Sequence, residues 1–466
     1  MSDRRYELDL LRFYPLDSLI RWRGFPYVFQ GIALVVFLLL AYLGFGALSP
    51  EIINGKLFAQ SNIVTLVIWG LWWPAMIWMA VLFGRLWCMV CPLELISNLT
   101  ERLARKIGIK QRTVGTWLRS GALVVILYAT IQMLVAGIDL HRSPAATSVF
   151  LLVLLGGASV AGFIYKDRAF CRAFCPVGML LNAYGRGGMI AVRSGSSTVC
   201  GSCTGKDCLM ACNRAKADGR SCPSLLNPPR LNSNKDCLVC GQCIKACEPD
   251  NMRLLLRPPF SSRDERESIA SRPLTAFVGI ALGFVTSELA SESKSTQDIF
   301  LWVPERAAAL SGLPHLAGWF EGIWTLGVFP VLLGVMLGGF IAFITRDTIA
   351  VTLRRIALPV AVIVSAGHMC KALAKFTSWA GYLPFALRDP TGAKTAWAIS
   401  SHGLSAPQSL LDIHGISYIS IGLLLSGTLL AFREMRLANP ALLRTSAAPK
   451  LALAGLFIFI VTGWGA

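Results

Sequence analysis

Residues 200–247 read CGSCTGKDCLMACNRAKADGRSCPSLLNPPRLNSNKDCLVCGQCIKAC. This stretch holds two cysteine quartets, Cys200-x2-Cys203-x4-Cys208-x3-Cys212 (the first quartet) and Cys237-x2-Cys240-x2-Cys243-x3-Cys247 (the second quartet). A cubane iron–sulfur cluster takes four thiolates, and a Cys-x2-Cys-x2-Cys turn supplies three of them from one short loop. The spacing therefore predicts two [4Fe–4S] clusters.

The fourth ligand of each cluster is expected to come from the other quartet, as in two-cluster ferredoxins. This rule groups Cys200, Cys203 and Cys208 with Cys247, and Cys237, Cys240 and Cys243 with Cys212. Cys222, followed by Pro223, is an alternative to Cys212 as the remote ligand. A pair of zinc sites is the competing interpretation, because Cys-x2-Cys knuckles also suit tetrahedral zinc. Three thiolates within one seven-residue turn favour iron–sulfur.

The rest of the chain is too apolar for a soluble protein of this length. Of its 466 residues, 54% are hydrophobic and 15% charged. A membrane helix needs roughly 20 apolar residues. Nine runs approach this length, so the sequence predicts about nine transmembrane helices: 26–47, 62–83, 119–138, 148–165, 273–290, 322–344, 356–375, 410–431 and 451–464.

The net charge of +18 follows the predicted topology and does not indicate nucleic-acid binding. With the N-terminus in the cytoplasm, the inner segments hold 36 of the 44 Lys and Arg residues and the outer loops hold six. This asymmetry satisfies the positive-inside rule. It predicts a multi-pass protein of a bacterial inner membrane, in contact with lipid, whose cysteines other than Cys370 lie at or beyond the cytoplasmic face. Structural disulfides are disfavoured there.

These observations predict an α-helical polytopic membrane protein with an inserted small α+β, ferredoxin-like 2[4Fe–4S] module. The module lacks helical periodicity and is rich in Gly, Asn, Pro and Ser, so metal ligation is expected to supply much of its order. The predicted domains are a cytoplasmic arm (1–25), a four-helix membrane domain (26–165), the cytoplasmic module (166–272) and a C-terminal domain of about five helices (273–466).

A sequence repeat lies at the inner ends of the second and fourth predicted helices. The segment 84–95, GRLWCMVCPLEL, resembles 167–179, DRAFCRAFCPVGM. Two equivalent hairpins would bring the four cysteines of the repeat to one membrane face, and the proline after each second cysteine would end or kink a helix. We call these four residues the Cys-Pro cysteines: Cys88, Cys91, Cys171 and Cys175.

The Cys-Pro cysteines are candidates for an additional redox or metal site. Arg85 and Arg168 each stand three residues before the first cysteine of a motif and are expected to favour the thiolate form. The alternatives are a third cluster, a dithiol relay, a transient metal site, or four reduced thiols packed at helix ends. The spacing does not choose among them.

Two of the five histidines are candidates for a haem or quinone site. His368 lies in the seventh predicted helix and His414 begins the eighth, both toward the outer side. Imidazoles on neighbouring helices can bind a b-type haem or line a quinone site, although packing histidines are the simpler interpretation. His368, Met369 and Cys370 also offer copper ligands, but three adjacent helical residues do not face one point.

Basic residues of the predicted module are candidates for docking an acidic ferredoxin or flavodoxin. They include Lys206, Lys235 and Lys245, and their charge would also favour the reduced state of nearby clusters. No Rossmann glycine pattern, Walker loop or serine-nucleophile elbow is present. An electron carrier or an oxidoreductase subunit is therefore favoured over a self-contained enzyme.

The paired Cys-Pro motifs followed by two quartets resemble the NapH and NosR polyferredoxin-like membrane proteins, and more distantly CcoG (FixG, RdxA). The resemblance covers about residues 20–255. Members usually carry Cys-x3-Cys-Pro twice; the second motif here matches, whereas the first is Cys-x2-Cys-Pro. NosR-type proteins also carry a flavin-binding domain before their helices, and NapH ends near the module, so residues 273–466 lie outside the resemblance.

The resemblance implies electron transfer between the quinone pool or a cytoplasmic donor and a respiratory reductase, or support of that reductase's maturation. It implies [4Fe–4S] clusters as cofactors and a membrane redox subunit as partner. Two other functions compete with electron transfer. The chain could reduce or hand over copper or a thiol during the maturation of a metalloenzyme, or it could be a redox sensor that signals through its added helices.

Overall fold

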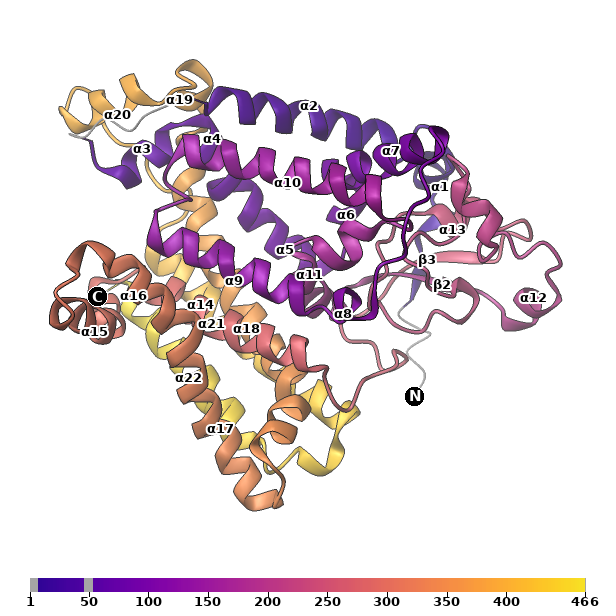
Figure 1. Cartoon of the computed structure of the whole chain (residues 1–466). Coiled ribbons are helices and arrows are strands. Elements are labelled where there is room, and N and C mark those ends of the chain that lie inside the picture. The colour runs from indigo at the N-terminus through magenta and orange to yellow at the C-terminus, as the bar shows by residue number, and fades with distance from the viewer. Residues whose placement is uncertain (1–6, 46–52, 466) are drawn as a thin grey trace. The chain divides into compact units, whose positions relative to one another are not determined.

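The computed structural model describes residues 7–45 and 53–465, which are mostly helical (Figure 1). The chain divides into two compact units. Unit 1 is formed by Met1–Leu38, Met79–Val124 and Val153–Arg266, and unit 2 by Leu39–Trp78, Val125–Leu152 and Glu267–Ala466. The predicted module and the two Cys-Pro motifs thus share one unit, whereas the sequence assigns the first motif and the module to separate domains.

Six helices among the described residues are long and apolar enough to cross a membrane, so the chain is a membrane protein. They are Ile63–Phe83 (which includes α5, Trp73–Phe83), Pro144–Ile164 (α10), Arg272–Ala290 (α14), Pro314–Thr345 (which includes α17, Phe329–Thr345), Ile349–Ala380 (α18) and Ile413–Ala438 (α21).

The other three predicted spans are helices of only 16 or 17 residues. They are Tyr27–Leu43 (α2), Ala122–Gly137 (α9) and Ala447–Thr462 (α22). At 1.5 Å per residue they are shorter than the roughly 30 Å hydrocarbon core. Every predicted run is therefore helical, and the number nine stays a prediction.

The helices of unit 2 pack mainly around α18. This helix contacts α14, α17, α21 and α22, and α14 also contacts α22. Between α14 and α17 the chain forms α15 (Lys294–Leu310) and α16 (Ala317–Ile323). The link between α18 and α21 holds α19 (Leu383–Arg388) and α20 (Ala393–Ser400).

A three-stranded antiparallel sheet frames the cysteine-rich segment of unit 1. The strands are β1 (Leu8–Asp9), β2 (Ile190–Ser194) and β3 (Met252–Leu256), in the order β1-β3-β2. Ser194, at the end of β2, pairs with Met252, at the start of β3. The first quartet follows β2 and the second precedes β3, so the pairing brings the two ends of the cysteine-rich segment together.

Short elements join the sheet to the two Cys-Pro motifs. The segment between β2 and β3 contains only two short α-helices, α12 (Ser197–Ser202) and α13 (Gln242–Lys245), and two 3-10 turns. The first Cys-Pro motif forms α6 (Trp87–Val90), and Pro92 then begins the amphipathic α7 (Pro92–Lys106). After the second motif the chain forms α11 (Gly178–Tyr184). Each proline therefore separates helical segments, as predicted.

The two copies of the repeat also share a left-handed turn. Gly84 has φ of 75° and Asp167, its counterpart, has φ of 64°. A Cβ atom on Gly188 would lie 2.6 Å from the backbone nitrogen of Gly84, so the chain after α11 passes directly against the first motif.

Candidate iron–sulfur sites

Asn251 donates hydrogen bonds to one cysteine of the first quartet and to the last cysteine of the second quartet. The Asn251 side chain donates a hydrogen bond to Cys200 Sγ at 3.1 Å, and its backbone N–H donates to Cys247 Sγ at 3.2 Å. The same side chain bonds the backbone of Ser196, so it bridges the chain leaving β2 and the chain entering β3. Hydrogen bonds to cysteine sulfur are typical of iron–sulfur sites.

Cys208 completes this group from the interior. Burial raises the pKa of its thiol to about 11, and Cys247, Cys200 and Cys203 add to the effect as neighbouring negative charges. Cys200, Cys203, Cys208 and Cys247 are the set that the sequence predicts for one cluster, and their shared ligation stays a prediction.

The other three cysteines of the second quartet line a cavity, and Cys222 is the fourth cysteine in its wall. Cys237, Cys240 and Cys243 face this space together with Cys222 and the following Pro223. Burial raises the pKa of Cys237 to about 12. Cys212, the predicted fourth ligand, is exposed and does not line the cavity.

A direct hydrogen bond joins the two groups. The backbone N–H of Cys222 donates to the backbone oxygen of Cys208 at 3.0 Å. Cys208 also contributes to the raised pKa of Cys243. The two cysteine groups therefore lie side by side in unit 1.

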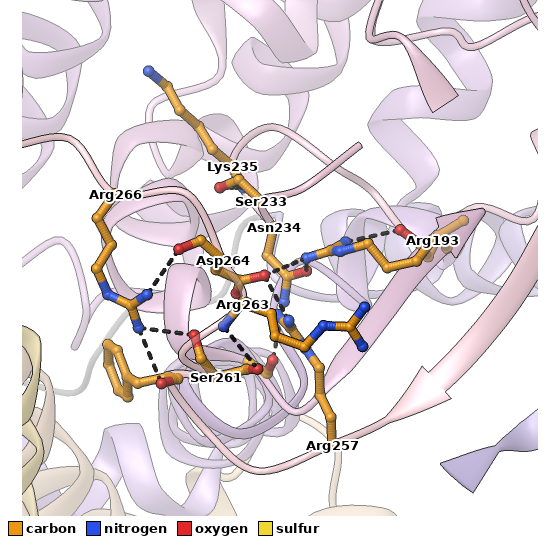
Figure 2. A network of polar contacts seen from close by, with 12 residues as sticks. Arg193, Ser233, Asn234, Lys235, Arg257, Ser261, Arg263, Asp264 and Arg266 are labelled. Atoms are coloured by element: carbon orange, nitrogen blue, oxygen red, sulfur yellow. Dashed lines mark hydrogen bonds and ion pairs between the residues drawn. The ribbon is translucent and has the colours of Figure 1, made fainter. Parts of the chain in front are cut away.

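A network of ion pairs and hydrogen bonds surrounds Asp264 beside the sheet (Figure 2). Asp264 accepts hydrogen bonds from Arg193 at 2.7 Å and from Arg257 at 2.6 and 2.5 Å. Arg193 also donates to the side chain of Asn234, whose backbone oxygen accepts from the N–H of Cys237. The carboxylate thereby connects β2, the chain after β3 and the loop that begins the second quartet.

Replacing Asp264 by Asn is expected to destabilise unit 1 by about 3 kcal/mol, because two buried guanidinium groups lose their shared counter-charge. The Asp264 side chain is 8% exposed and that of Arg257 is 2% exposed. Thermal unfolding in detergent, followed by circular dichroism, measures the effect. Glu265→Gln, at the exposed neighbouring position, is the matched control and should leave the unfolding midpoint unchanged. Equal midpoints for both variants would refute the role given to Asp264.

The Cys-Pro cysteines form a third group. Cys91, Cys171 and Cys175 pack against one apolar cluster that includes Ala158 and Ala161 of α10. Burial raises the pKa of Cys91 well above its ordinary value, and Cys171, Cys88 and Cys175 raise it further. Burial likewise raises the pKa of Cys175 to about 12. Four thiols crowded in this way need a positively charged centre to become thiolates together.

Arginines lie beside these thiols, as predicted, but burial outweighs their effect. Arg168 approaches Cys171 Sγ at 3.7 Å, yet the pKa of Cys171 is raised, because burial exceeds the opposing influence of the guanidinium. Arg168 thus favours the thiolate form of Cys171, but burial opposes this effect more strongly. The arginines also have a carboxylate partner that the sequence did not reveal. Glu94 lies 2.9 Å from Arg168 and 3.1 Å from Arg220, and it is 3% exposed.

Lys245 does not belong to a docking surface. Its ammonium group bonds Asp218 and the backbone oxygens of Trp22 and Phe25, and its side chain is only 4% exposed. The prediction of Lys245 as a docking residue is wrong, because this side chain ties the N-terminal arm to the module. Lys206 is exposed and Lys235 is half-buried.

The two candidate haem histidines lie in different surroundings. His368 is 3% exposed and packs against the rings of Trp73 and Phe284, with centroids 6.4 and 5.7 Å away. His414 is exposed in the first turn of α21, which Asp412 caps. Cys370 is buried and its thiol donates to the oxygen of Ala366. The structure does not bring these residues together as a ligand set, and a haem, quinone or copper site here stays a prediction.

Unit 2 contains a buried charge cluster that the sequence reasoning did not assign. Lys371 of α18 lies 2.6 Å from Glu292 and 3.4 Å from Glu288, and it donates to Ser291 at 2.8 Å. Lys371 is 8% exposed. A lysine inside an apolar run is the sequence feature that could have indicated this cluster. Its partner carboxylates, at and just after the end of α14, could be identified only from the structure.

Three or more His, Cys, Asp or Glu side chains do not converge on a single-ion site anywhere within residues 7–45 and 53–465. One cysteine group, Cys222 with Cys237, Cys240 and Cys243, lines a cavity. In a cubane cluster each thiolate binds a different iron, so the sulfur atoms stand apart around the cage. Zinc would draw four sulfur atoms to about 2.3 Å from one ion. The cavity beside Cys222, Cys237, Cys240 and Cys243 suits sulfur atoms that stand around a cage.

Comparisons with known proteins agree with this chemistry. A family model described as a 4Fe-4S binding domain matches residues 65–110 and 147–193, the segments that carry the Cys-Pro cysteines. Iron–sulfur clusters are therefore supported, although this match does not include the two quartets.

Curated relatives match about a third of the chain. The ferredoxin-type protein NapH of Haemophilus influenzae is 28% identical over 187 residues, which are 36% of this chain and 61% of that protein. NapH of Escherichia coli is 27% identical over 197 residues, 37% of this chain and 62% of that protein.

A third relative is the methylamine utilization ferredoxin-type protein MauN of Methylobacillus flagellatus, 26% identical over 33% of this chain and 56% of that protein. The chain thus spans about three fifths of the two NapH proteins. No solved structure matches it. The predicted resemblance to NapH-type, polyferredoxin-like membrane proteins is confirmed.

Proposed function

We propose that this NapH-type chain is a membrane-bound electron-transfer protein of a respiratory system. It would pass electrons between two clusters in a cytoplasmic module and a redox partner in the membrane, through a third cluster at the Cys-Pro cysteines. The NapH and MauN relatives support the ferredoxin-type role.

The adjacency of three cysteine groups within unit 1 is the observation that carries this proposal. Cys222 bonds Cys208, which joins the first two groups. Glu94 links the second group to the Cys-Pro cysteines through two arginines. One is Arg168, whose guanidinium lies 3.7 Å from Cys171 Sγ, and the other is Arg220, whose backbone N–H donates to Gln242 between Cys240 and Cys243. These contacts support an electron route from the module to the Cys-Pro cysteines.

Each group offers soft thiolate ligands in a largely dry setting, which is what an iron–sulfur cluster requires. When bound, the clusters supply one-electron oxidation and reduction. The chain itself fixes the ligands, excludes water and supplies positive charge through Arg85, Arg168 and Arg220. Fixed cations near a cluster favour its reduced, more negative state.

The distribution of Lys and Arg supports a cytoplasmic module, which a soluble ferredoxin or flavodoxin could reach. An acceptor within the bilayer, such as a quinone, suits a third group beside the membrane helices. Residues 273–466 would hold or serve that acceptor.

Electron exchange in lipid nanodiscs tests this function. Anaerobically purified protein is reduced with dithionite, freed of excess reductant and mixed with decylubiquinone. We expect the cluster absorption that dithionite bleaches to return as the quinone oxidises the protein. Reduced clusters that do not respond would contradict the quinone-linked route, and zinc without labile sulfide would contradict the function as a whole.

A further inference from the structure

Cys222 is held in a ligand position that the quartet spacing does not predict. It lines the same cavity as Cys237, Cys240 and Cys243, and its N–H is anchored on Cys208. The cavity offers about 370 Å³ free of protein atoms, part of it open to solvent. Its other walls are mainly apolar side chains such as Val192, Leu226 and Leu238.

The environment of Cys222 resembles that of the other cysteines that line the cavity. Burial raises the pKa of its thiol and Cys240 adds to the effect, whereas the backbone N–H groups of Leu226 and Ser224 oppose it. Pro223 follows the cysteine directly, as proline often follows the remote cysteine of bacterial ferredoxin runs. Cys212 differs in each respect that matters here, since it is exposed, lies outside the cavity and is followed by Asn213.

Arg220 fixes the Cys222 loop from both sides. Its backbone N–H donates to the side chain of Gln242, which lies between Cys240 and Cys243. Its guanidinium donates to Glu94 at 3.1 Å and to Asn98 at 3.2 Å, both on α7. The loop is therefore clamped between the second quartet and the helix that follows Cys91.

We propose that Cys222, in place of Cys212, is the fourth ligand of the cluster held by Cys237, Cys240 and Cys243, and that Arg220 positions this cluster beside the Cys-Pro cysteines. This inference rests on the proposed function. It also assigns a role to the 24 residues between the quartets (213–236), because they carry a ligand and the contact to α7.

Matched serine variants test the ligand assignment. Cys222→Ser should lose about four irons and four sulfides per protein and the EPR signal of one reduced cluster, whereas Cys212→Ser should keep all of them. The reverse result would overturn the assignment. Wild-type protein without iron or sulfide would instead refute the proposed function, so the two failures are distinguishable.

Alkylation of the wild-type protein gives a second readout that needs no variant. Under anaerobic conditions a maleimide should label Cys212 readily and leave Cys222 unlabelled until the iron is removed by a chelator. Mass spectrometry of the peptides identifies the labelled thiol. Rapid labelling of Cys222 in iron-loaded protein, with Cys212 protected, would refute the proposal.

The positioning role of Arg220 has its own signature. Arg220→Gln should keep every iron but weaken the magnetic interaction between the reduced clusters, seen as narrower EPR lines, because the loop loses its anchor on Glu94. Arg220→Lys should retain part of the broadening. Unchanged line widths in Arg220→Gln would show that the guanidinium does not set the spacing of the clusters.

Discussion

Replacing Cys91 and Cys175 together by serine should remove about four of roughly twelve irons and stop electron transfer to a quinone. Cys91 and Cys175 come from different motifs, so the double change removes half of the thiols of the third group. The two groups in the module keep all their ligands, and dithionite should still reduce them.

Iron and sulfide analysis together with quinone-driven reoxidation measures this result. Cys370→Ser is the control, because it removes a buried thiol that donates to Ala366 and belongs to none of the three groups. If the double variant retained all of its iron and its reoxidation rate, the Cys-Pro cysteines would be packed thiols without a cluster.

Replacing Glu94 by Gln is the other change for which we expect a large effect. Glu94 is 3% exposed and accepts contacts from Arg168, Arg220 and Gln30. Burial opposes its charge, yet the two arginines and the Gln30 hydrogen bond keep its pKa below the ordinary value. Without the carboxylate, two buried cations lose their partner, which typically costs about 3–5 kcal/mol.

The variant should therefore show a markedly lower unfolding midpoint in detergent and a reduced yield of iron-loaded protein. The double change Glu94→Gln with Arg220→Met removes one cation as well and should recover part of the loss, as expected for coupled neighbours. If Glu94→Gln unfolded at the same midpoint as the wild type, solvent and not Glu94 would stabilise the positive charges of the two arginines.

The cysteine groups show which parts of the site could be predicted from sequence. Cys200 and Cys247, which the ferredoxin rule assigns to one cluster, both accept a hydrogen bond from Asn251, because β2 and β3 pair directly beside them. The sequence offers Cys222 only as an alternative to Cys212, because the choice between them depends on how loop 213–236 folds back onto the second quartet through contacts that are distant in sequence.

Contacts between residues distant in sequence also explain why the sequence analysis misjudged Lys245 and overlooked Glu94. Lys245 carries a positive charge in a polar segment and was therefore predicted to be exposed, but Asp218 and two backbone oxygens bury it. Glu94 was not singled out, because its partners Arg168 and Arg220 lie 74 and 126 positions away. Charge alone does not reveal which long-range partners a side chain will meet.

The positions of the membrane helices, in contrast, could be predicted well from the sequence. Hydrophobic runs gave the position of each helix, because an apolar helix in lipid needs no partner to satisfy its backbone. They did not give the length, and three of the nine predicted runs form helices of 16 or 17 residues. The polar group around Lys371 in α18 also depends on packing between helices that only the fold displays.

The most direct measurement is an iron and labile-sulfide determination on anaerobically purified protein, combined with EPR of the dithionite-reduced sample. Three clusters predict about twelve irons and twelve sulfides per chain and a spectrum broadened by interaction between neighbouring clusters. About eight irons, unchanged by serine at Cys91 and Cys175, or zinc without sulfide, would contradict a chain of three clusters leading to the membrane.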